Sequence, residues 1–242
     1  MNTQPPEPPP DYQDHLGASR QYLRDIILGV NDGLVSTFLL VAGVVGGGMS
    51  AANVLLTAVA GAVAGMVSMG VGEYLATKSQ EEVFEAEMAL EKQHLVDHRD
   101  HERDELEHMF AEMGLDGDDL ETVVTIINSS DEAMLGVMAG LEFGVVDSER
   151  RSPYAAGFAS AGLFLLGALP SIIPFAFTDD TRTGLIAAGI LTGIGLFAVG
   201  LAKTFMTKTN PVLAGLENLG IGLAGGVVSF FIGRGFDAII NS

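Results

Sequence analysis

Five long runs of apolar residues dominate the chain, and most are separated by short polar connections. Each run is long enough to cross the hydrocarbon core of a bilayer, which takes about 20 residues of helix. Apolar runs of this length also occur as buried helices in large soluble proteins, but five of them in 242 residues favour a membrane protein. The predicted spans are residues 26–48, 52–76, 154–177, 184–205 and 212–232.

The lysines and arginines predict which span ends face the cytoplasm, where basic residues collect. Only Arg182 and Arg234 fall on one side of a five-span arrangement. We therefore expect the N-terminus and residues 78–152 in the cytoplasm, and the C-terminus outside the cell or in a lumen. The basic residues on the predicted cytoplasmic side are Arg20, Arg24, Lys78, Arg150, Arg151, Lys203 and Lys208.

The pattern divides the chain into four regions of an all-α membrane protein. Residues 1–19 form an acidic, proline-rich tail that we expect to be disordered and cytoplasmic. Residues 20–77 carry the first two transmembrane helices, and residues 153–242 carry the last three. Between them, residues 78–152 are expected to fold as a three-helix cytoplasmic domain.

The three helices of this inserted region are predicted from periodicity and capping signals. A long amphipathic helix is expected over residues 79–113, ending at Gly114. Asp118-x-x-Glu121 and Ser129-x-x-Glu132 have the spacing of capping boxes, which open helices. The third helix is expected to end near Val146.

The net charge and the absence of cysteine limit the partners and metal ligands that the chain can use. The net charge is −19, and residues 78–151 contribute −15 of it, with 21 acidic and 6 basic residues. Nucleic acid is excluded as a partner, because phosphate binding needs clustered Lys and Arg. There is no cysteine, so disulfides and thiolate metal sites are excluded, and any metal must use oxygen, nitrogen or thioether ligands.

Ionisable residues inside the predicted spans are candidates for function, because a charge in hydrocarbon is costly. Asp32 lies about six residues into the first span, with no Lys or Arg in the middle of any span to pair with it. Met69 and Glu73 share a helix face at the end of the second span, although membrane methionines often serve packing alone. Glu217, near the start of the fifth span, is a third candidate, although its side chain could equally extend to the membrane interface.

A stripe of acids and histidines marks the predicted long helix of the insert. Stacked like charges are unfavourable unless a cation lies on them, so we interpret the stripe as a metal site. It contains two Glu-x-x-His pairs, the spacing of di-iron helical bundles, and Met138 and Glu142 of the third helix could complete the site. The alternative is an acidic surface of the kind that halophilic proteins carry. The stripe is Glu87, Glu91, His94, His98, His101, Glu105, His108 and Glu112, flanked by Glu102.

The motifs DGLVS at residues 32–36 and SMG-x-GEY at residues 68–74, together with the acidic insert between spans two and three, resemble the vacuolar iron transporter family. The similarity runs from about Arg20 to Arg234. It implies a homodimeric, proton-coupled antiporter, not an enzyme, that moves Fe²⁺, and often Mn²⁺, out of the cytoplasm. In a prokaryote, the cell membrane is the expected location.

The same resemblance implies roles for individual residues. Asp32 and Met69 correspond to the family's transport pathway, with Glu73 and Glu217 as further pathway candidates. No permanently bound cofactor is expected, and histidine replaces a family glutamate at position 94, which adds Zn²⁺ and Co²⁺ as candidate ions. The implied cytoplasmic ligands are Glu91, His94, Glu102, Glu105, Met138 and Glu142, and the stripe adds His98, His101 and His108.

Two other classes of function stay open at this point. A membrane-anchored ferroxidase or iron-storage protein would use the Glu-x-x-His pairs for oxidation, but three helices would have to dimerise to build a four-helix di-iron site. A membrane sensor or scaffold with a salt-tolerant acidic surface is the other alternative, and the unpaired Asp32 argues against it.

Overall fold

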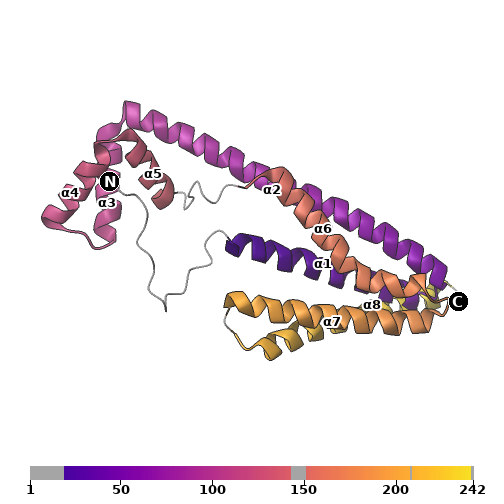
Figure 1. Ribbon diagram of the computed structural model, residues 1–242. Coiled ribbons are helices and arrows are strands. Elements are labelled where there is room, and N and C mark those ends of the chain that lie inside the picture. Colours follow the sequence, from indigo (N-terminus) through magenta and orange to yellow (C-terminus); the bar gives the residue numbers. More distant parts are fainter. Residues whose placement is uncertain (1–18, 143–150, 208, 241–242) are drawn as a thin grey trace, which may run out of the picture. The chain divides into compact units, whose positions relative to one another are not determined.

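The computed structural model describes residues 19–142, 151–207 and 209–240, and these residues form helices without any strand. The all-α prediction is thus confirmed for the part of the chain described. In chain order the elements are α1 (Ser19–Gly46), α2 (Ala51–Asp97), α3 (Arg99–Glu112), α4 (Gly117–Asn128), α5 (Asp131–Glu142), α6 (Pro153–Ile172), the 3₁₀ helix η2 (Ile173–Ala176), α7 (Thr181–Thr207) and α8 (Pro211–Ile240) (Figure 1).

Five of these helices are long and apolar enough to cross a membrane, as the sequence predicted. They are α1, the start of α2, α6 with η2, α7 and α8. Pro170 lies in the last turn of α6, which tightens into the 3₁₀ helix where Pro174 follows. Proline removes a helical hydrogen bond, so both residues account for the change of helix type.

Helix α2 corrects the prediction of a separate long helix over residues 79–113. It runs without interruption for 47 residues, about 70 Å, which is more than twice the thickness of a hydrocarbon core. The helix breaks at His98, whose φ of −137° and ψ of 33° leave the helical region, and α3 begins at the next residue. The stripe of acids and histidines therefore does not lie on one helix face.

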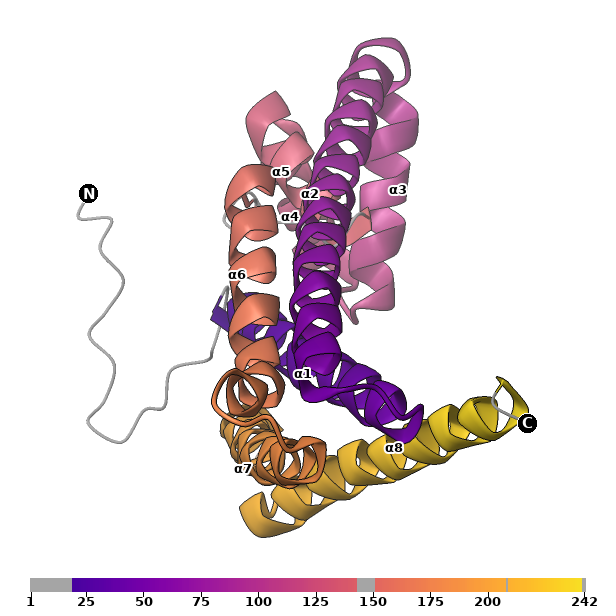
Figure 2. The same ribbon diagram turned by 90° about the vertical axis from the view of Figure 1, so that its right-hand side faces the viewer.

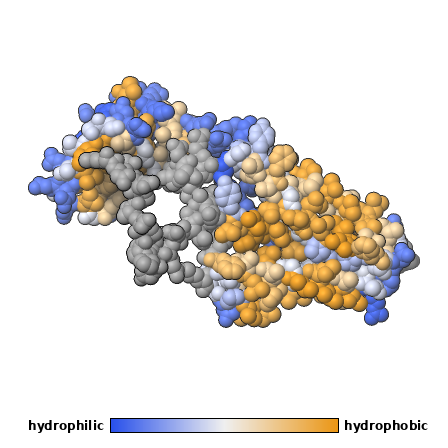
Figure 3. All heavy atoms as spheres, viewed as in Figure 1, coloured by the Kyte–Doolittle hydropathy of each residue, from blue (hydrophilic) through white to orange (hydrophobic). Residues whose placement is uncertain are grey.

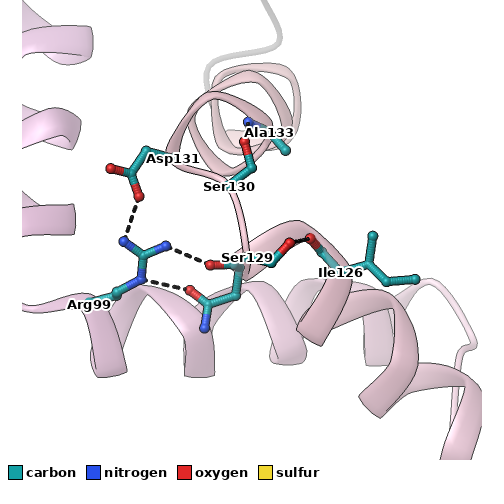
Figure 4. A network of polar contacts seen from close by, with 7 residues as sticks. Arg99, Ile126, Ser129, Ser130, Asp131 and Ala133 are labelled. Carbon is teal, nitrogen blue, oxygen red and sulfur yellow. Dashed lines mark hydrogen bonds and ion pairs between the residues drawn. The ribbon is translucent and has the colours of Figure 1, made fainter.

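The starts of α4 and α5 each differ from the prediction by a residue or more. Asp116 is the N-cap of α4, without a side-chain cap, and Asp118 lies in the first turn, where its charge favours the helix dipole. Ser130 caps α5 by accepting a hydrogen bond from the amide of Ala133 at 3.3 Å. Ser129 instead donates to the Ile126 carbonyl at the end of α4 (Figure 4). The predicted end near Val146 lies outside the described residues.

The chain divides into two compact units, and each is described by itself. We call residues 1–63 with 163–242 the bundle unit, and residues 64–162 the insert unit. In the bundle unit α1, α7 and α8 pack against one another (Figure 2). Small residues let the helices approach closely: a Cβ on Gly233 of α8 would collide with the Gly43 carbonyl of α1.

The insert unit has a hydrophobic core of its own. Leu95 of α2, Leu106 of α3, Val124 of α4 and Met134 and Met138 of α5 are buried together. In the view of Figure 3, hydrophilic side chains predominate over α3 and α4, whereas α1, α6 and α7 show mostly apolar ones. Through this core, four helices from separate sequence segments hold their polar residues in fixed positions.

Arg99 ties three of these helices together at the start of α3. Its Nε donates to the Asn128 side chain at 3.0 Å, Nη2 donates to the Asn128 carbonyl at 2.5 Å, and Nη1 lies 2.6 Å from an Asp131 carboxylate oxygen (Figure 4). One side chain thus fixes α3 to the end of α4 and to the start of α5.

Candidate metal centre

Two carboxylates and one imidazole come together where α2 ends and α3 begins. The Nδ1 atom of His94 lies 3.4 Å from Oε1 of Glu102 and 4.0 Å from Oε2 of Glu91. One ligand atom from each of the three residues can be chosen so that all lie within 4.8 Å of one another. Glu91 and His94 are one turn apart on α2, and Glu102 lies in the first turn of α3 after the break at His98.

The two carboxylates of this group are withdrawn from solvent. Glu91 is 4% exposed and Glu102 is 3% exposed. Oε1 of Glu91 is fully buried and has no hydrogen-bond partner among the described residues. A buried polar atom without a partner costs free energy, and an ionised carboxylate costs more, so this oxygen requires a proton or a cation.

The neighbouring negative charges also favour a proton or a cation at Glu91. Burial, followed by the charges of Glu102, Glu142 and Glu105, raises the pKa of Glu91 to about 7. The pKa of Glu142 is also raised, first by desolvation and then by the charges of Glu105 and Glu102. The four predicted carboxylate ligands therefore act on one another, and a divalent cation among them would relieve their repulsion.

The spacing of the three closest ligand atoms suits a transition metal. With metal–ligand bonds of about 2.1 Å, two ligands at tetrahedral angles lie about 3.4 Å apart. The His94–Glu102 distance equals this value, and the His94–Glu91 distance exceeds it slightly. One nitrogen and several carboxylate oxygens are ligands for divalent ions such as Fe²⁺, Mn²⁺, Co²⁺ and Zn²⁺.

The other predicted histidines lie outside this group. His98, His101 and His108 are exposed. His98 is the residue at which the helix breaks, and Nε2 of His108 lies 3.4 Å from the exposed Glu112, one turn along α3. Within the described residues, only Glu91, His94 and Glu102 meet as three possible metal ligands.

Met138 packs inside the insert unit. It is fully buried in the core, beside Leu106 and Met134. A thioether in this position fills the core, so its role as a ligand stays a prediction. Ala139, which follows it, is also buried.

Asp32 lies on α1 in the bundle unit, and its side chain is exposed on the single chain. Its backbone carbonyl accepts a hydrogen bond from the Ser36 hydroxyl at 2.5 Å. No Lys, Arg or His forms an ion pair with its carboxylate within the part of the chain that the structure describes. The role of Asp32 in a transport pathway stays a prediction.

Met69 and Glu73 lie on α2 in the insert unit, and both are half-buried. Glu73 has a partner that the sequence did not indicate, because Nη2 of Arg151 lies 3.6 Å from its carboxylate. The Arg151 side chain is 11% exposed and the Glu73 side chain is 23% exposed. The sequence marked Arg151 only as an orientation signal. The ion pair explains how Glu73 is tolerated near the end of a span.

Glu217 lies on α8 and is exposed. It borders a cavity of about 400 Å³ in the bundle unit, and Arg24 and Lys203 border the same cavity. Two positive side chains disfavour a divalent cation at this position, since like charges repel. The sequence predicted that Arg24, Lys203 and Glu217 lie near the same membrane interface, but it did not predict that they border one cavity.

Comparison with known proteins extends over both units. The model of the VIT family matches residues 23–234. Vacuolar iron transporter 1 of Eucalyptus grandis is 31% identical over 210 residues, which cover 87% of this chain and 84% of the relative. Vacuolar iron transporter 1 of Arabidopsis thaliana is 29% identical, over 88% of this chain and 86% of the relative. Protein CCC1 of Saccharomyces cerevisiae is 30% identical, over 87% of this chain and 68% of the relative.

Proposed function

Because the chain belongs to the VIT family, we propose that it is a transporter of divalent iron, and of Mn²⁺ as well, that moves the ion out of the cytoplasm in exchange for protons. The observation that carries this proposal is the Glu91–His94–Glu102 group, in which both carboxylates are buried and one carboxylate oxygen has no hydrogen-bond partner among the described residues. The similarity to vacuolar iron transporters supports iron as the cargo. It gives no support to a ferroxidase or an iron store.

The first step of the proposed mechanism is capture of the ion by the insert unit on the cytoplasmic side. The net charge of −15 over residues 78–151 concentrates divalent cations near the site. His94, Glu91 and Glu102 then supply ligands, with Glu105 and Glu142 as carboxylates in electrostatic reach. Binding displaces the proton that the raised pKa of Glu91, about 7, favours on this carboxylate.

The second step takes the ion across the membrane through Asp32 and Met69. Asp32, in the bundle unit, offers a hard oxygen ligand to the ion. Met69, in the insert unit, offers a soft sulfur ligand, a ligand type that suits Fe²⁺ more than Ca²⁺ or Mg²⁺. A carboxylate binds metal only when it is deprotonated, so a proton arriving from the opposite side competes with the ion. This competition couples the two movements in opposite directions.

A second copy of the chain would complete the pathway. An unpaired carboxylate facing lipid is costly, and Asp32 is exposed on the single chain. If another copy covers this face of α1, Asp32 lies in a protein-lined passage instead of in lipid. We therefore include a homodimer in the proposal.

The test is a flux assay with the full chain reconstituted in vesicles, in which Fe²⁺, Mn²⁺ and Zn²⁺ are each offered with and without a pH gradient. The proposal predicts that Fe²⁺ enters the vesicles, that an opposing proton gradient accelerates its entry, and that the vesicle interior loses protons as metal enters. Metal entry at the same rate as in protein-free vesicles would contradict transport. Metal entry without any proton movement would contradict the coupling.

A further inference from the structure

The cavity beside Glu217 has a chemistry that metal transport does not explain. It lies between α1, α7 and α8, all within the bundle unit, and measures about 400 Å³. It sits at the span ends where lysine and arginine collect. Arg24 borders it from α1 and Lys203 from α7, so two helices each contribute one positive charge.

The walls of the cavity are apolar below these charges. Ile27 from α1, Val199 from α7 and Ile221 from α8 line it, so each of the three helices contributes an aliphatic side chain. From Arg24 to Asn31 the cavity follows α1 for two turns, about 10 Å. With the span ends placed at the membrane interface, as the sequence predicts, a site of this depth would continue into the hydrocarbon.

The inner end of the cavity is closed by polar groups that already have partners. Asn218 donates to the Asn31 side chain at 2.9 Å and to the Leu196 carbonyl at 2.8 Å. These groups therefore do not require a ligand. The end of the cavity with Arg24 and Lys203 is different. The Arg24 side chain is 69% exposed, and the one ion pair that it forms with a described residue is with its neighbour Asp25, at 3.4 Å. Lys203 forms no ion pair with any described residue.

We propose that this cavity binds one anionic phospholipid, with its phosphate at Arg24 and Lys203 and the start of an acyl chain along Ile27, Val199 and Ile221. Basic pockets between transmembrane helices recognise lipid phosphates by this combination. Two positive charges against the single carboxylate of Glu217 disfavour a metal ion in this cavity. A free anion would leave the apolar walls without a partner. Glu217 accepts a hydrogen bond from a headgroup hydroxyl, so a glycerol headgroup is favoured over a bare phosphate.

The experiment is native mass spectrometry of the full chain, purified in detergent and exposed to phosphatidylglycerol, phosphatidic acid, phosphatidylcholine or inorganic phosphate. We expect one tightly retained phosphatidylglycerol per chain and weaker retention of phosphatidylcholine. The double variant Arg24→Gln, Lys203→Gln should retain phosphatidylglycerol about tenfold to thirtyfold less well, since each interfacial cation contributes to the attraction.

Three control variants separate lipid binding at this cavity from a general loss of positive charge and from unfolding. Arg182→Gln, Arg234→Gln removes the same charge from the opposite ends of α7 and α8 and should retain the lipid. Arg24→Lys, Lys203→Arg keeps the charge and should also retain it, which shows that substitution at these positions does not unfold the protein. Glu217→Leu removes the acceptor for the headgroup hydroxyl and should lower the retention of phosphatidylglycerol relative to that of phosphatidic acid, which has no such hydroxyl.

The proposal is overturned if the neutral double variant retains phosphatidylglycerol as the unmodified protein does, or if the Arg182, Arg234 control loses it equally. Displacement of the lipid by inorganic phosphate at equal concentration would also overturn it, because the site would then bind a free anion.

Discussion

Nδ1 of His94 lies 3.4 Å from a carboxylate oxygen of Glu102, although the helix that carries His94 ends three residues later and Glu102 belongs to the next helix. The break at His98 makes this contact possible, because it turns α3 back so that Leu106 packs with Leu95 in one core. The candidate metal centre thus depends on a tertiary contact between two helices and not on one helix face.

Replacing Glu102 tests this centre. Glu102→Gln removes one buried carboxylate of the candidate site and should weaken Co²⁺ binding by at least tenfold, measured by titration calorimetry on the full chain in detergent. Glu107→Gln is the matched control, because Glu107 lies on the same helix and pairs with Arg103 at the surface. Equal affinity of the two variants would contradict the assignment of Glu102 as a ligand.

The pH dependence of stability follows from Glu91. Its pKa in the folded protein, about 7, lies above its ordinary value of 4.5, so between these pH values the folded chain binds more protons than the unfolded chain. The metal-free protein should therefore lose stability as pH rises from 5 to 8, by about 3 kcal/mol at most.

Thermal unfolding in the presence of a chelator measures this loss, with Glu91→Gln as the control. The unmodified protein should show a melting temperature that falls from pH 5 to pH 8 relative to that of the variant, and added Zn²⁺ should remove the difference at pH 8. A difference that grows in favour of the unmodified protein as pH rises would contradict a raised pKa at Glu91.

Arg99 holds the helices that carry the ligands. Arg99→Ala removes hydrogen bonds to Asn128 and the ion pair with Asp131, and should cost about 1–3 kcal/mol of stability. Hydrogen exchange should accelerate in α4 and α5. Arg103→Ala, which removes ion pairs at the surface of the same helix, should cost less than about 1 kcal/mol. Equal exchange in both variants would show that Arg99 does not join the helices.

Close packing of α1 against α8 predicts a different sensitivity for two nearby glycines. A methyl group at Gly233 would meet the Gly43 carbonyl, a backbone atom that cannot rotate away, whereas one at Gly235 would meet nothing within 4 Å. Gly233→Ala should lower the melting temperature by several degrees, and Gly235→Ala should leave it within about one degree. Equal melting temperatures would contradict this packing.

The sequence predicted the spans well because an apolar run of about 20 residues has few alternatives in a folded chain. It also named Glu91 and His94 as candidate ligands from their spacing, and Glu102 through the family resemblance, and the structure brings these three side chains together. It failed at the His98 break, since acids and histidines at steps of three and four continue the helical pattern through it. Partners such as Arg151 for Glu73 and Asn128 for Arg99 depend on tertiary packing, which local spacing does not encode.

The most direct test of transport through Asp32 is Fe²⁺ flux into vesicles that contain the Asp32→Asn variant, compared with Asp179→Asn in the exposed turn before α7. Asp32→Asn preserves the shape of the side chain and removes its charge. We predict that this variant loses at least 90% of the flux, roughly a tenfold reduction, while Co²⁺ binding at the Glu91–His94–Glu102 group stays unchanged and Asp179→Asn transports normally. Undiminished flux through Asp32→Asn would contradict the proposal that this carboxylate carries the metal across the membrane.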